Sequence, residues 1–135
     1  MTLAEVVMAM GVAGLATTGV VNGYIFCAAS AEKSALSLAA SARAVERMEQ
    51  THAATWSTSG STIIDQLNAT NFPTEVVTLD LPSAKGIITY ATNFTEISTI
   101  STNPPLRRIH VDCVWSYRGS SLVFTSSVET CRSPE

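Results

Sequence analysis

The chain begins with a long apolar segment that a single acidic residue introduces. Glu5 is the only charged residue before Glu32, and residues 6–31 form an uncharged run of 26 residues. At about 1.5 Å per residue, a helix of this length can cross the roughly 30 Å hydrocarbon core of a bilayer. A secretory signal peptide carries basic residues before its apolar run, whereas Glu5 is acidic. The pattern therefore predicts a membrane-compatible helix that differs from an intact signal peptide.

Residues 29–54 favour a continuation of this helix, because they are rich in Ala, Leu, Glu, Lys, Arg and Met and contain no Gly or Pro. A single helix over residues 2–54 would be about 80 Å long. Apolar side chains recur in its second half at three- and four-residue steps, and this face is predicted to pack on a sheet: Ala35, Leu36, Leu38, Ala42, Val45 and Met48. The opposite face is predicted to be solvated: Glu32, Lys33, Arg43, Glu46, Arg47 and Glu49.

The rest of the chain alternates between polar connections and segments that favour strands. Ser, Thr, Gly and Asn dominate residues 55–73, which predicts a connection with one short helical turn at 62–67. Four later segments, rich in β-branched and aromatic residues, are predicted to be strands: 75–81, 86–91, 106–117 and 121–128. The predicted fold class is therefore α+β, with the C-terminal half of a long helix packed on a four-stranded, mainly antiparallel sheet.

The pairing of the last two predicted strands with each other can be derived from the turn between them. A two-residue turn at Gly119-Ser120 would place four pairs opposite one another: Tyr117 with Leu122, Trp115 with Phe124, Cys113 with Ser126, and Val111 with Val128. This register puts the apolar members on one face, as half-buried antiparallel strands require. A hairpin is therefore expected at the C-terminal end of the sheet.

The N-terminal motif carries a family resemblance. The sequence Met1-Thr2-Leu3-x-Glu5-Val6, followed by the uncharged run, resembles the mature N-terminus of type IV pilins and of the pseudopilins of type II secretion. The segment VDCVWSYRGSSLVF is more weakly similar to the ends of minor pseudopilins. The resemblance implies that a prepilin peptidase removes a leader and N-methylates Met1, and that Glu5 is needed for assembly. It also implies the ladle-like pilin fold, with a filament-core helix over 1–28 and a globular domain over 29–135.

The resemblance implies a structural role in place of an enzymatic one. Such a subunit is stored in the cytoplasmic membrane and then polymerises through its N-terminal helix into a cell-surface or extracellular filament, with an assembly machinery as its partner. An isolated carboxylate in an apolar environment needs a partner, and Glu5 could pair with the Met1 amine of its own chain or of a neighbour. Two alternatives stay open: a bitopic membrane protein with a small extracytoplasmic ligand-binding domain, and a secreted enzyme that keeps its anchor. Motility, adhesion, DNA uptake and secretion are not distinguished.

The chain has three cysteines, and Cys27 lies inside the apolar run. In the pilin family a disulfide ties down the C-terminal region, which implies a bond between Cys113 and Cys131. Such a bond would place the domain in an oxidising compartment. It would also require the chain after about residue 128 to fold back over the sheet. The remaining thiol, at Cys27, is expected to be reduced and packed among helices.

Composition and motifs do not support other classes of function. The net charge of −3 and the pI near 5.3 do not indicate a nucleic-acid partner. The two histidines, His52 and His110, lack further ligands at the spacing of a metal site. Neither a phosphate-binding glycine loop nor a nucleophile motif occurs. We therefore expect no cofactor, no metal and no catalytic residues.

Overall fold

A single long helix dominates the N-terminal part of the chain. The computed structural model describes residues 2–58, 63–79, 88–117 and 121–135. Helix α1 spans Leu3–Ala53, close to the predicted range of 2–54, and it continues through all four glycines of its first half. The chain divides into two compact units, Met1–Ser34 and Ala35–Glu135, and α1 contributes to both.

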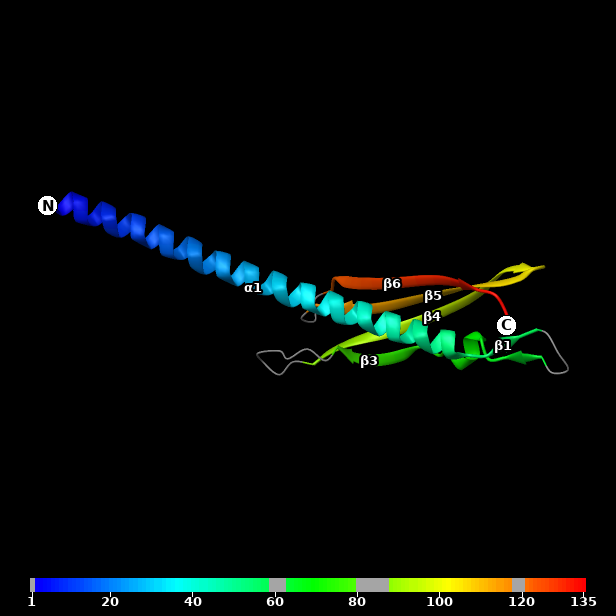
Figure 1. The fold of residues 1–135 in the computed structure, drawn as a ribbon. Helices are drawn as coiled ribbons and strands as arrows, with labels where there is room; N and C mark the ends of the chain where they lie inside the picture. The colour runs from blue at the N-terminus through cyan, green and yellow to red at the C-terminus, as the bar shows by residue number, and fades with distance from the viewer. Residues whose placement is uncertain (1, 59–62, 80–87, 118–120) are drawn as a thin grey trace. The chain divides into compact units, whose positions relative to one another are not determined.

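The second unit combines the C-terminal part of α1 with an antiparallel sheet, which confirms the α+β prediction. The order of the four strands is β3-β4-β5-β6, and each neighbouring pair is antiparallel. Figure 1 shows these strands side by side, with the C-terminal part of α1 lying along them. The strands of this sheet are β3 (Glu75–Leu79), β4 (Thr89–Thr102), β5 (Pro105–Ser116) and β6 (Val123–Arg132). Along the chain, three short elements follow α1 and precede β3. They are the paired strands β1 (Trp56–Ser57) and β2 (Ile64–Asp65), which form a ribbon, and the 3-10 helix η1 (Ala69–Asn71).

The core forms where one row of helix side chains meets the inward face of the sheet. The buried helix row has a four-residue spacing: Leu36, Ala40, Ala44 and Met48. The buried face of β5 supplies Ile109, Val111, Cys113 and Trp115. The two alanines are completely buried. Burial of this row is the main force that holds the helix on the sheet.

The predicted sheet-facing side of the helix is only partly correct. Leu36 and Met48 are buried, but Leu38 is 74% exposed and Val45 is 47% exposed. The predicted face passed through Leu38, Ala42 and Val45, whereas the buried row runs through Ala40 and Ala44. Alanine carries a weak hydrophobic signal, so the sequence did not show which i, i+4 row of the helix meets the sheet.

Arg47 corrects the prediction of a fully solvated charged face. Only 7% of Arg47 is exposed. Its guanidinium donates hydrogen bonds to the Thr95 hydroxyl at 3.2 Å, the Gln50 side-chain oxygen at 2.8 Å and the Pro73 carbonyl at 2.6 Å. A buried charge is tolerated because these acceptors replace water.

The predicted register of the last hairpin is confirmed. Trp115 pairs with Phe124, Cys113 with Ser126, and Val111 with Val128. The rings of Trp115 and Phe124 stack with their centroids 4.9 Å apart. The predicted Gly119-Ser120 turn lies outside the described residues. The assumed position of the turn and the alternation of apolar and polar residues together predicted this pairing. The ladder ends at Ser116 and Val123, so the fourth predicted pair, Tyr117 with Leu122, lies just beyond it.

Strand lengths and one local element differ from the predictions. β4 extends to Thr102, through Ser and Thr residues that the prediction treated as a connection, because β5 pairs with them. The helical turn predicted at 62–67 is wrong, since Ile64–Asp65 is a strand that pairs with Trp56–Ser57. The helical turn occurs later, at η1, where the Asn68 side chain accepts a hydrogen bond from the Thr70 N–H. Asn is a favoured capping residue, so this start was readable from the sequence.

The predicted disulfide between Cys113 and Cys131 is wrong, because all three cysteines are free thiols. Cys113 pairs with Ser126 and Cys131 pairs with Arg108, so five residues of β6 separate the two rungs. At about 3.3 Å per residue this is roughly 17 Å, whereas a disulfide needs Cα atoms within about 7 Å. Cys113 is buried and Cys131 is exposed. The strand continues to Arg132, so the tail does not fold back, and the disulfide no longer supports an oxidising compartment.

Candidate functional site

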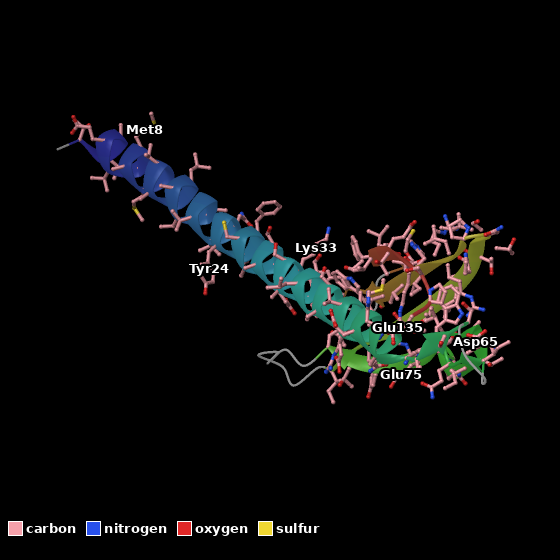
Figure 2. The ribbon with its side chains drawn as sticks, turned by 45° about the vertical axis from the view of Figure 1, so that its right-hand side comes forward. Met8, Tyr24, Lys33, Asp65, Glu75 and Glu135 are labelled. Atoms are coloured by element: carbon pink, nitrogen blue, oxygen red, sulfur yellow. The ribbon has the colours of Figure 1, made fainter. Side chains whose placement is uncertain are left out.

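The N-terminal unit presents apolar side chains on all sides. Leu3 is 84% exposed, Leu15 is 78% exposed, and Tyr24 and Phe26 are each 75% exposed. Figure 2 shows side chains projecting around the helix segment that carries Met8 and Tyr24. By length and composition α1 could cross a membrane, and none of its most apolar window is buried inside the chain. An apolar surface of this extent needs lipid or other protein to cover it, which indicates membrane association or a signal sequence.

Glu5 closes a cap at the start of this helix. The Thr2 N–H donates to Glu5 Oε2 at 2.8 Å, while the Thr2 carbonyl accepts from the Glu5 N–H at 3.1 Å and the Val6 N–H at 3.4 Å. Thr2 is therefore the N-cap and Glu5 the third helical residue, as in a capping box. A carboxylate in the first turn also interacts favourably with the helix dipole. The Thr-x-x-Glu spacing is the sequence signal for this cap, and the prediction had considered only an amine as the partner of Glu5.

The cap does not use the full capacity of the carboxylate. A carboxylate has two oxygens and about four lone-pair positions, and Thr2 occupies one of these on Oε2. An ammonium group can therefore bind the same carboxylate while the cap stays intact. Met1, the other predicted assembly residue and the predicted site of cleavage and methylation, lies outside the described residues.

Two threonines inside the apolar segment satisfy their hydrogen bonds within the helix. The Thr17 hydroxyl lies 3.0 Å from both the Ala13 and Gly14 carbonyls, and the Thr18 hydroxyl lies 2.8 Å from the Gly14 carbonyl. Such bonds to the preceding turn remove the cost of burying a hydroxyl in an apolar environment. These threonines therefore do not oppose burial of the segment in lipid or among helices.

Two carboxylates of the second unit contact the same histidine, His110. His110 Nε2 lies 3.0 Å from Asp112 Oδ1, and His110 Nδ1 lies 3.3 Å from Glu129 Oε2. The two carboxylates thus contact opposite sides of the imidazole. Within the described ranges, no group of three or more His, Cys, Asp and Glu residues could hold a metal ion. His52 lies apart, in the last turn of α1.

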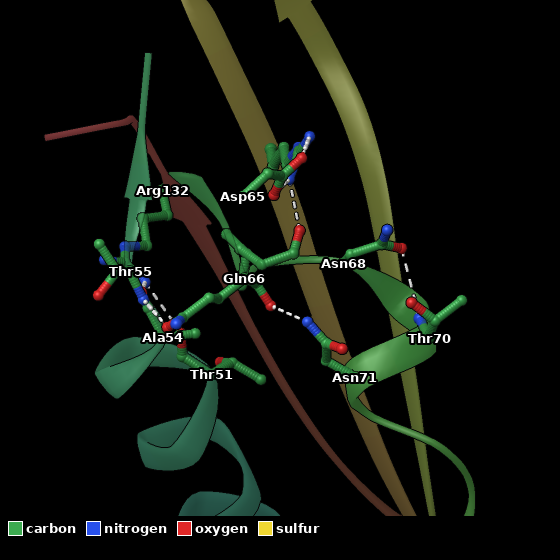
Figure 3. A network of polar contacts seen from close by, with 11 residues as sticks. Thr51, Ala54, Thr55, Asp65, Gln66, Asn68, Thr70, Asn71 and Arg132 are labelled. Atoms are coloured by element: carbon green, nitrogen blue, oxygen red, sulfur yellow. Dashed lines mark hydrogen bonds and ion pairs between the residues drawn. The ribbon is translucent and has the colours of Figure 1, made fainter. Parts of the chain in front are cut away.

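Two arginines fasten the end of the helix and the β1–β2 ribbon to the sheet. Arg132 donates to the Thr51 carbonyl at 2.9 Å and to the Ala54 carbonyl at 2.6 Å, which caps the C-terminus of α1 (Figure 3). Arg107 makes two bonds to the Asp65 carboxylate, at 2.6 and 2.7 Å. This pairing holds the pKa of Asp65 below its usual value and raises the pKa of Arg107. These contacts explain the architecture and leave the N-terminal unit as the candidate functional site.

The long apolar helix and the antiparallel sheet form a pilin-like arrangement. Comparison of the chain with protein-family models, with curated proteins and with solved structures gives no match.

Proposed function

We propose that this chain is a structural subunit of a type IV pilus-like or type II secretion-like filament. The single observation that supports this most is the N-terminal unit itself: an exposed, uncharged helical segment headed by one carboxylate at position 5. In the proposed cycle the segment lies in the cytoplasmic membrane before assembly and in the core of the filament afterwards. The sheet domain then forms the outer layer of the filament, which reaches the cell surface.

Energetics support a reversible exchange between these two states. Burying apolar surface contributes about 25 cal/mol per Å², and lipid and neighbouring helices both cover such surface. Extraction from lipid into a helical bundle therefore replaces one apolar environment by another. The internally satisfied hydroxyls of Thr17 and Thr18 add no penalty in either state. An assembly machinery would then need to supply only a modest net free energy.

Glu5 has two separable roles in this proposal. Its Oε2 caps its own helix through the Thr2 N–H, and its charge pairs with the N-terminal amine of a neighbouring subunit. Pairing with a neighbour would set the stagger between helices, because an unpaired carboxylate in the bundle costs several kcal/mol. Prepilin peptidase would expose and methylate the amine of Met1.

The substitution Glu5→Gln separates the two roles. Glutamine keeps an oxygen that can accept from the Thr2 N–H but carries no charge. We expect the variant to remain in the membrane fraction and to form few filaments by electron microscopy, since the loss of about 3 kcal/mol reduces incorporation more than 100-fold. Glu49→Gln is the matched control, because Glu49 is an exposed carboxylate of the same helix in the second unit. Filaments of Glu5→Gln at the wild-type yield would refute the assembly role of the charge.

The main alternative is a membrane-anchored protein with a small ligand-binding domain. It uses the same apolar helix but needs neither the charge of Glu5 nor a processed amine at Met1. Mass spectrometry of the N-terminal peptide separates the two, because an N-methylated Met1 favours the filament subunit. A retained basic leader and no filaments in a wild-type culture would favour the anchored protein.

A further inference from the structure

Asn22 carries the only side-chain amide of the uncharged run over residues 6–31. Along the axis of α1 it lies about 25 Å from Glu5 and about 15 Å from Glu32. A hydrocarbon core of roughly 30 Å that is centred on the run therefore contains Asn22. Within the described ranges, its side chain makes no hydrogen bond.

An amide in this position needs a hydrogen-bond partner from outside the chain. It has two N–H donors and one acceptor oxygen, and moving such a group into an apolar environment without partners is unfavourable. Lipid tails offer no partner. Thr17 and Thr18 avoid the problem, because each hydroxyl has a carbonyl acceptor in the preceding turn. Asn22 is therefore the polar group of this segment that a neighbouring protein would satisfy.

Asn22 borders an open groove along one side of α1. The volume of the groove is about 280 Å³, and its lining residues are Thr17, Thr18, Val21 and Asn22. These residues belong to two neighbouring ridges of the helix, 17–21 and 18–22. A second helix packs its side chains into the groove between two such ridges. The amide thus lies at the edge of a surface that fits another helix.

The proposed contact of Glu5 with the Met1 amine of a neighbour determines what Asn22 meets. In parallel helices this contact sets a stagger of four residues, which places Asn22 level with Thr18 of the neighbour. Glu5 and Asn22 lie about 100° apart around a helix with 3.6 residues per turn. This angle is within the width of the face that a helix buries. One stagger therefore allows both contacts.

The Thr18 hydroxyl can accept a hydrogen bond from such a neighbour. It donates its proton to the Gly14 carbonyl at 2.8 Å, and a hydroxyl oxygen also has two lone pairs. Thr17 has the same chemistry, with its hydroxyl 3.0 Å from the Ala13 and Gly14 carbonyls. However, Thr17 is one residue out of level and points about 100° further around the helix. The stagger therefore selects Thr18.

We propose that the Asn22 side-chain amide donates a hydrogen bond to the Thr18 hydroxyl of a neighbouring copy of this chain. The partner is a parallel α1 displaced by four residues along the axis. The inference rests on the proposed filament role and adds to it a second contact far along the helix from Glu5. Two separated contacts fix the stagger and the rotation of adjacent helices together, which a single contact at the helix start does not.

Cysteine cross-linking in purified filaments tests the geometry. Filaments are formed from an equal mixture of Thr18→Cys and Asn22→Cys subunits and are oxidised with copper phenanthroline. Both subunits also carry Cys27→Ala and Cys131→Ser, which remove the exposed thiols. We expect disulfide-linked dimers, because the two introduced cysteines lie level on adjacent helices.

Two matched samples control for unspecific cross-linking. In filaments of Asn22→Cys alone, the stagger separates neighbouring cysteines by about 6 Å along the axis, in addition to the distance between the helices. A disulfide needs Cα atoms within about 7 Å, so we expect about tenfold fewer dimers. A mixture of Thr17→Cys and Asn22→Cys should give a similarly low yield, because residue 17 points away from the contact.

Filament yields of four variants test the hydrogen bond itself. Asn22→Leu and Thr18→Val should each lower the yield about threefold, the average effect of one hydrogen bond between apolar helices. The double variant should lose no more than either single variant, because both substitutions remove the same contact. Thr17→Val is the control and should assemble at the wild-type yield.

The possible failures separate this inference from the filament role. Filaments whose mixed cysteine variants give no dimers would overturn the contact and leave the filament role intact, and so would equal cross-linking of Asn22→Cys alone. Additive losses in the double variant would show that the two side chains act independently, which also overturns it. The absence of filaments in the wild type would refute the proposed function, and the inference with it.

Discussion

Arg107 joins the β1–β2 ribbon to the sheet, and its replacement by lysine should destabilise the second unit measurably. Its guanidinium holds the Asp65 carboxylate with two hydrogen bonds, at 2.6 and 2.7 Å, and donates a third to the Leu67 carbonyl. It also lies over the Trp56 ring, 4.5 Å from the ring centre. Lysine keeps the charge but has neither the planar fork nor the flat face that these contacts require.

The expected loss of folding free energy in Arg107→Lys depends on how exposed each contact partner of Arg107 is. The hydrogen bond to the buried Leu67 carbonyl contributes about 1.5 kcal/mol, as a charged donor does. Since the Asp65 side chain is 37% exposed, the ion pair is screened by solvent and contributes only about 0.5 kcal/mol. Stacking on Trp56 adds about 0.5 kcal/mol. The sum, reduced by the contacts that lysine retains, is about 2 kcal/mol, which corresponds to a fall in Tm of about 10 °C in a domain of this size.

Thermal unfolding followed by circular dichroism measures this change, and Arg108→Lys is the matched control. Arg108 is the next residue, but it points to the opposite face of β5, where its guanidinium is 4.0 Å from Glu129 and its side chain is 45% exposed. We expect the Arg108→Lys variant to unfold within about 0.5 kcal/mol of the wild type. If the two variants lost equal stability, or if Arg107→Lys lost none, the contacts of Arg107 would not be what secures the ribbon.

Three further predictions concern other contacts of the second unit. Arg132→Met removes the cap from the Thr51 and Ala54 carbonyls, so amide hydrogen exchange near the end of α1 should accelerate and stability should fall by about 1–2 kcal/mol. The pKa of Asp65 is lowered in the folded chain, so the contribution of its charge to folding stability is present above about pH 4 and is lost as the pH falls further. The difference in unfolding free energy between the wild type and Asp65→Asn should therefore shrink in acid, and a constant difference would contradict this. In the folded protein a maleimide should label the exposed Cys131 but not Cys113, because burial shields Cys113 and raises its thiol pKa; labelling of Cys113 before unfolding would refute that burial.

The sequence predicted the features that depend on repeated local signals. The helix α1 follows from a long segment without proline or strong strand signals, and the β5–β6 register follows from the assumed turn together with alternation across Trp115, Cys113 and Val111. Many residues along each element contribute to the same prediction, so a single atypical residue does not change the predicted structure. The α+β class was predictable for the same reason.

The features that the sequence did not predict depend on single long-range contacts. Arg47 resembles its solvated neighbours on the helix, and only its packing near Thr95 and Pro73 shows that it is buried. The free thiols of Cys113 and Cys131 depend on how far β6 extends along β5. The cap formed by Glu5 and Thr2 is a local contact, and its three-residue spacing could be seen in the sequence. It was missed because the prediction considered only an amine as the partner of Glu5.

The glycines of the first unit have no structural reason within a single chain. A Cβ added at Gly11, Gly14, Gly19 or Gly23 would meet no atom within 4 Å, so none of these positions is kept small by the chain's own packing. Each glycine nevertheless costs up to about 1 kcal/mol relative to alanine in a helix interior. Small residues in apolar helices let backbones approach closely when helices associate. The positions that weaken the isolated helix are therefore the ones that would favour close packing between helices, as the proposed polymerisation through this segment would require.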